Sequence, residues 1–145
     1  MNIILTRPLN DIENLMNELF SLGHKIMHIP TLKIVNASLD PISIHNYKAL
    51  IFTSSNAVRN IKIKEKRKNI KCFCVGSITE KIARTSGFTE TISASGNVNA
   101  LKNLIINSKE IKKNDKLAYI CGDQITLELD KELLTEGFKV KKFIN

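Results

Sequence analysis

The sequence predicts an α/β protein with a flavodoxin-like, doubly wound parallel sheet. Short apolar runs that end in turn residues alternate along the whole chain with stretches that repeat apolar residues at helical spacing. Several of the helical stretches end at a glycine, and another apolar run follows. This alternation is typical of parallel strands that are joined by helical crossovers.

The N-terminal part of the chain predicts one βαβ unit. Residues 2–6 and 25–29 have the composition of short strands, and two strands are too few for a stable sheet. The helix between them carries one apolar stripe, formed by Ile12, Leu15, Met16 and Leu19. We therefore expect residues 1–34 to begin an incomplete α/β domain and supply a linker strand, while residues 38–144 form the flavodoxin-like domain.

The remainder of the chain predicts five strands separated by four helices. A linker of weak periodicity at residues 31–46, with a short strand at 33–35, precedes them. Strands are expected at 49–53, 71–75, 90–93, 116–120 and 139–144, and helices at 55–62, 79–86, 97–105 and 125–136. Ile78 and Ile82 should face the core. Doubly wound sheets bind ligands at the carboxyl ends of their strands.

Composition limits the partners and the compartment. The net charge of +8 favours an acidic partner. The concentrated basic segment at residues 61–68 lacks interleaved aromatic side chains, so a solvated loop is expected there. No apolar run reaches the ~20 residues that a membrane helix needs, and no signal peptide is recognised. Cys72, Cys74 and Cys121 lie in apolar runs, which predicts buried, reduced thiols and a cytoplasmic protein.

Familiar catalytic and cofactor motifs are missing from the sequence. It has neither the glycine pattern of dinucleotide-binding turns nor a P-loop, and its three histidines show no metal-ligand spacing. Hydroxyls, small residues and one arginine remain at the predicted strand ends, in Thr6-Arg7, Thr53–Asn56, Gly76–Thr79 and Gly122–Gln124. Such groups beside helix N-termini suit the binding of several carboxylates or phosphates rather than general-base catalysis.

The strongest local pattern is the buried strand that leads into Thr53, Ser54, Ser55 and Asn56 at the start of a helix. Unpaired first-turn N–H groups and neighbouring hydroxyls can hold an anion. Alternatively, Ser54 or Ser55 is simply an N-cap. The local pattern leaves both interpretations open.

Several motifs, in order along the chain, resemble the uroporphyrinogen-III synthase family. They are Ile4–Pro8, Leu22-Gly23, Pro30, Ile51–Val58, Val75–Thr79, Ser86–Phe88, Tyr119–Gly122 and Gly137–Val140. The resemblance implies two similar α/β domains, in which the chain starts the first, builds the whole second and returns to finish the first. Residues 1–34 and 38–144 match the first two stages, and we expect catalysis to need the returning part.

The resemblance also implies an activity. The family cyclises hydroxymethylbilane to uroporphyrinogen III with inversion of ring D and loss of water, a lyase reaction of porphyrin and haem biosynthesis that uses no cofactor. It implies a cytoplasmic monomer that binds a polycarboxylate tetrapyrrole and neither nucleic acid nor membranes. The implied substrate-binding residues are Thr6, Arg7, Thr53, Ser54, Ser55, Asn56, Gly76 and Thr79, with no catalytic group or metal ligand assigned.

One residue departs from the family pattern, and two other functions stay open. Glu80 stands where the family usually has alanine, and it either places a negative charge beside the site or points outward. The first alternative function is a non-catalytic, flavodoxin-like module that binds an anion or nucleotide at residues 53–56. The second is a basic protein that associates with nucleic acid through residues 62–68.

Overall fold

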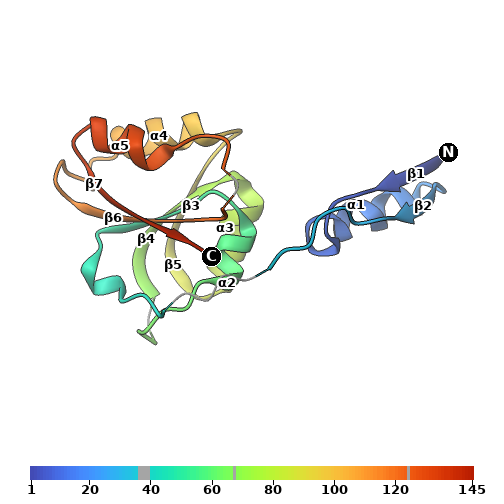
Figure 1. Ribbon diagram of the computed structural model, residues 1–145, viewed down its shortest axis with the longest axis horizontal. Helices are drawn as coiled ribbons and strands as arrows, with labels where there is room; N and C mark the ends of the chain where they lie inside the picture. Colours follow the sequence, from blue (N-terminus) through green and yellow to red (C-terminus); the bar gives the residue numbers. More distant parts are fainter. Residues whose placement is uncertain (36–39, 67, 124) are drawn as a thin grey trace. The chain divides into compact units, whose positions relative to one another are not determined.

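The computed structural model describes residues 1–35, 40–66, 68–123 and 125–145. The chain divides into two compact units, Met1–Asn36 and Ala37–Asn145. Each unit has its own parallel sheet, of two strands in the first and five in the second (Figure 1). Residue 38, where we expected the second domain to begin, lies outside the described residues.

The first unit is the predicted βαβ unit. It consists of β1 (Asn2–Leu5), α1 (Leu9–Ser21) and β2 (Lys25–His28), with Ile4 opposite Met27 in the parallel pair. Ile12 is the buried residue of α1. The apolar stripe is only partly covered, because Leu15 is 46% exposed. Ile4 and Met27 are also largely exposed, so this small sheet buries little of its apolar surface.

The second unit contains a five-stranded, wholly parallel sheet. Its strands are β3 (Ala49–Phe52), β4 (Lys68–Val75), β5 (Phe88–Ala94), β6 (Lys116–Cys121) and β7 (Lys139–Ile144), in the order β5-β4-β3-β6-β7. The predicted doubly wound, parallel α/β fold is confirmed. Numbered within this sheet the order is 3-2-1-4-5, whereas the order in flavodoxin itself is 2-1-3-4-5.

Two helices cover each face of this sheet. The core on one face includes residues of α2 (Ser55–Asn60) and α3 (Gly76–Thr85), and the core on the other includes residues of α4 (Val98–Ile106) and α5 (Leu129–Thr135) (Figure 1). All four residues of β3 are completely buried between them. A strand covered on both faces needs apolar residues at every position, which explains the continuous Ala49–Phe52 run.

The structure corrects several predicted boundaries and one predicted face. Helix α3 begins at Gly76, and it buries Thr79 and Ala83, while Ile78 is 70% exposed. The inward orientation predicted for Ile78 is therefore wrong, although Ile82 packs against the core. The predicted strand at 33–35 is absent, and η1 (Ile44–Asn46) forms inside the predicted linker. In the described parts of the chain, no helix combines the length and apolar character needed to cross a membrane.

Candidate functional site

The predicted residues of the second unit gather at the carboxyl edge of its sheet. Phe52 ends β3 and pairs with Cys74 on one side and Ile120 on the other. Thr53 therefore lies between the ends of β4 and β6. The chain leaves β3 toward α2 on one face, and it leaves β6 toward α5 on the opposite face. Such a reversal between neighbouring strands is where doubly wound proteins bind ligands.

The turn between β3 and α2 supports the N-cap interpretation of Ser54. Its backbone is extended, and its Oγ accepts a hydrogen bond from the N–H of Ala57 at 3.2 Å. The hydroxyl proton is not used in that contact and can still be donated to an anion. Capping and anion binding are therefore compatible at this residue. Because α2 has only six residues, its dipole adds little to such a site.

Arg59 adds a cation that was not predicted at this edge. Its Nη1 donates to Ser55 Oγ at 3.0 Å and to Asn56 Oδ1 at 3.3 Å, one turn earlier in α2. The guanidinium thus lies beside two predicted site residues while remaining exposed. The sequence did contain a signal for this contact. Arg59 follows Asn56 by three residues and Ser55 by four, and such spacings place side chains on the same face of a helix.

Thr53 contacts a buried phenol. Its Oγ1 lies 3.4 Å from the Oη of Tyr119, a residue of β6 that is 1% exposed. Burial raises the pKa of Tyr119 to about 12, so the phenol is neutral near pH 7. Tyr119 therefore positions the Thr53 hydroxyl and supplies no charge. Sequence reasoning missed it because it lies inside an apolar strand.

The start of α3 lies beside this turn, since β3 and β4 are neighbours and α2 packs against α3. Gly76 has φ of +75°, a conformation that strongly favours glycine, and it takes the chain directly from β4 into the helix. The N-cap residue Val75 has no polar side chain, and no side-chain cap is formed among the described residues, so the first-turn N–H groups of α3 are available as donors. Thr79 is only 6% exposed.

Glu80 is held against β5. Its carboxylate accepts hydrogen bonds from Ser93 Oγ at 2.5 Å, Arg84 Nη2 at 2.8 Å and Thr91 Oγ1 at 3.3 Å. The hydrogen bond from Ser93, followed by smaller contributions from Thr91 and Arg84, lowers the pKa of Glu80. The carboxylate is thus ionised, and its charge is compensated locally. The side chain does not point outward into solvent, because it is 21% exposed and packs against β5, where its charge is already paired with Arg84.

The first unit carries the other two predicted residues, Thr6 and Arg7, directly after β1. Both side chains are exposed. Their backbone carbonyls are fixed, because Thr6 O accepts from the Thr31 N–H at 2.9 Å and Arg7 O accepts from His28 Nε2 at 2.8 Å. His28 was not predicted to have any role. This hydrogen bond places the imidazole of His28 beside the backbone of Arg7, just after the end of β1.

The remaining predicted strand end follows β6. Gly122 is half-buried and Asp123 is exposed, whereas Gln124 lies outside the described residues. Asn145 links this end to α2, because its N–H donates to Cys121 O at 3.0 Å and its side chain donates to Ala57 O at 2.9 Å. These contacts fasten the chain after β7 next to the β3–α2 turn.

Neither a thiol nucleophile nor a metal centre is formed by the described residues. Cys72, Cys74 and Cys121 are buried as free thiols, as predicted, and burial raises the pKa of each. Their thiolate forms are therefore scarce near pH 7. Within the described ranges, no three His, Cys, Asp or Glu side chains come together as metal ligands. The arrangement is suited to binding through hydroxyl, amide and guanidinium donors.

The fold and this edge define a doubly wound α/β protein with a hydroxyl-rich site at the ends of its strands. A family model described as "Uroporphyrinogen-III synthase HemD" matches residues 13–144. The chain belongs to the uroporphyrinogen-III synthase family, which confirms the resemblance seen in the sequence.

A solved structure is similar to this chain. The crystal structure of uroporphyrinogen-III synthetase from Helicobacter pylori 26695 matches with a TM-score of 0.56 and 20% sequence identity. The match covers 83% of this chain and 54% of that chain, so this chain spans about half the length of its structural relative. At this identity the likeness concerns the fold alone. A search among curated proteins found no match.

Proposed function

We propose that this chain is the part of a uroporphyrinogen-III synthase that binds the linear tetrapyrrole and directs its ring closure. The reaction converts hydroxymethylbilane to uroporphyrinogen III, with inversion of ring D and loss of water, and makes the protein a lyase of porphyrin and haem biosynthesis. The observation that carries the proposal is the family match over residues 13–144. We further propose a cytoplasmic monomer that binds neither nucleic acid nor membranes.

The carboxyl edge supplies the donors that a polycarboxylate needs. In this proposal, the hydroxyls of Thr53 and Ser54 and the first-turn N–H groups of α3 bind carboxylates of the substrate. The guanidinium of Arg59 adds charge beside Ser55 and Asn56. Bonds between an ionised carboxylate and such donors are among the stronger hydrogen bonds of proteins.

Catalysis in this proposal rests on positioning. Tyr119 has a raised pKa and Glu80 a lowered one, so neither group exchanges protons readily near pH 7. Holding the two reacting ends of a flexible chain together can by itself lower the barrier by several kcal/mol, on the order of 7–11 in the best cases. Thr6 and Arg7 of the first unit are proposed as further carboxylate contacts. The matched part of this chain covers 54% of the similar uroporphyrinogen-III synthetase, so further contacts are expected from the rest of the family fold.

A coupled assay tests this proposal. Hydroxymethylbilane is supplied to the chain, and the ratio of the uroporphyrinogen isomers III and I is measured after oxidation to the porphyrins. Isomer I is the product of spontaneous closure, so a heat-denatured sample gives the blank. Isomer III above that blank would support the proposal, and it would show that ring closure can be directed without the returning part of the family fold. Isomer I alone, from a sample shown to be folded by circular dichroism, would contradict the proposal that this chain directs ring closure.

A further inference from the structure

A pocket lies at the opposite end of the five-stranded sheet from the candidate site. It has a volume of about 380 Å³ and is lined by Asn46, Tyr47, Lys116, Leu117, Lys139, Val140 and Lys141. Lys116 and Lys139 are the first residues of β6 and β7. The pocket therefore lies where these strands begin, and none of the residues proposed to bind the tetrapyrrole lines it. We call it the lysine pocket.

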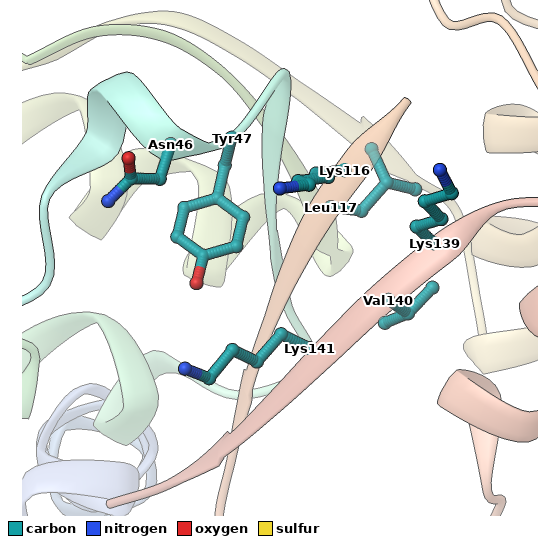
Figure 2. Close-up of a pocket in the computed structure, with 7 residues that line it drawn as sticks. All are labelled: Asn46, Tyr47, Lys116, Leu117, Lys139, Val140 and Lys141. Atoms are coloured by element: carbon teal, nitrogen blue, oxygen red, sulfur yellow. The ribbon is translucent and has the colours of Figure 1, made fainter. Parts of the chain in front are cut away.

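The three lysines start from one face of the sheet, and two of their amino groups extend toward a phenol. Lys116 pairs in register with Lys139, and Lys141 lies two residues further along β7 on the same face. Figure 2 shows the amino groups of Lys116 and Lys141 extending toward the side occupied by Tyr47, whose hydroxyl points toward Lys141. Lys139 directs its amino group the other way. Three hydrogen-bond donors thus surround one space.

Among the residues that the structure describes, no acidic side chain lines this pocket. Three of the lining residues are lysines. No ion pair between described residues involves these lysines. A neighbouring pocket of about 500 Å³ differs, since it contains both Glu90 and an ion pair of 3.1 Å between Lys71 and Glu110. The many lysines of this chain therefore do not by themselves explain why the lysines of the lysine pocket form no ion pair with a described residue.

An aromatic pair holds two of the donors in place. The rings of Tyr47 and Phe143 meet edge to face with centroids 6.0 Å apart. The amino group of Lys141 lies over the Phe143 ring, 5.2 Å from its centroid. Burial raises the pKa of Tyr47, so its hydroxyl stays protonated and can donate near pH 7. The donors are partly preorganised before any ligand arrives.

We propose that the lysine pocket binds a small multivalent oxyanion, of the phosphate or polycarboxylate type, between Lys116 and Lys141 with the Tyr47 hydroxyl as a further donor. Its volume is within the range of small-molecule sites. Lysine binds phosphate and carboxylate groups as a compact charge with several donor hydrogens. The inference is independent of the proposed function, because it concerns the other end of the strands.

Calorimetric titration of the folded chain with pyrophosphate and with citrate, at constant ionic strength, tests the inference. We expect saturable binding of at least one probe, and the tighter probe identifies the phosphate or the carboxylate class. The double variant K116Q/K141Q should weaken binding at least about tenfold. The matched control K81Q/K109Q removes the same charge from two exposed lysines that line neither pocket, and should change binding less than about twofold.

A charge-neutral variant keeps the test independent of net charge. Tyr47→Phe leaves the ring contact with Phe143 and removes only the hydroxyl, so binding should weaken about threefold or more. Three results would overturn the inference. They are no saturation by either probe at millimolar concentration, equal losses in the two double variants, and unchanged affinity in both K116Q/K141Q and Tyr47→Phe.

Discussion

Ser54 is proposed to have two roles, and a pair of substitutions separates them. Ser54→Ala removes both the N-cap acceptor of Ala57 and the hydroxyl that is proposed to contact a substrate carboxylate. Ser54→Gly removes the same hydroxyl, but glycine is nearly as good an N-cap as serine. The two variants should therefore differ in stability and agree in binding.

The expected magnitudes follow from the contacts. Loss of the cap should lower the free energy of unfolding by about 1 kcal/mol in Ser54→Ala and by only a few tenths of a kcal/mol in Ser54→Gly. For a unit of this size, about 1 kcal/mol corresponds to a decrease in Tm of about 4 °C. Loss of a hydrogen bond to a carboxylate, at about 1.5 kcal/mol, should weaken binding of uroporphyrinogen III roughly tenfold in both variants.

Thermal unfolding followed by circular dichroism measures the first effect, and anaerobic titration with uroporphyrinogen III measures the second. A decrease in Tm for Ser54→Ala alone, with equal loss of affinity in both variants, supports the two roles. If both variants bind like the unsubstituted chain, Ser54 is only a cap. Equal destabilisation by alanine and glycine would refute the capping argument.

Two further predictions concern stability. The hydrogen bond from Ser43, helped by the Ile44 N–H, lowers the pKa of Glu65 from 4.5 to about 2. Its ionised form therefore stabilises the fold above about pH 4.5, and this contribution is lost as the pH falls toward 2. Glu65→Gln should lower Tm at neutral pH, and its difference from the unsubstituted chain should shrink over that acidic range. A constant difference in melting scans from pH 7 to 2 would contradict the assignment. Separately, amides of β1, α1 and β2 should exchange with solvent faster than those of β3 and β6, because the first unit leaves Ile4 and Met27 exposed. Equal protection in both units, measured by hydrogen exchange with NMR, would contradict this.

The alternation of strands and helices could be predicted because each local signal agrees with the fold. The apolar run of β3 has no polar position, as a strand covered on both faces requires. Glycines mark the ends of α1 and α3, at Gly23 and Gly87, where positive φ values occur. Parallel strands then bring their carboxyl ends to one edge, and so six of the eight predicted site residues follow the neighbouring strands β3 and β4 at that edge.

The prediction errors arose at positions where contacts between elements distant in the sequence determine the structure. Ile78 was placed in the core by its apolar character, but α3 begins three residues earlier than predicted and turns Thr79 and Ala83 inward instead. Arg84, four residues after Glu80 on the same helix, was a local signal that the charge of Glu80 is compensated. Its hydroxyl partners lie on β5, 11 and 13 residues away, so local sequence could not show that the carboxylate packs there.

The residues that sequence reasoning missed are brought together by the fold. Tyr119 meets Thr53 across a separation of 66 residues, and its position in an apolar strand concealed its hydroxyl. The lysine pocket joins Tyr47 from the segment before β3 to lysines of β6 and β7. No local pattern marks those lysines in a chain with 22 lysines and arginines.

The carboxyl edge of the second unit is proposed to bind a polycarboxylate tetrapyrrole. Chemical-shift mapping of the ¹⁵N-labelled chain during anaerobic titration with uroporphyrinogen III tests this proposal most directly. We expect saturable shifts of the amides at residues 53–56 and 76–79, with those at 116 and 139–141 changing little. Shifts confined to the lysine pocket, or no saturable shift at all, would contradict it.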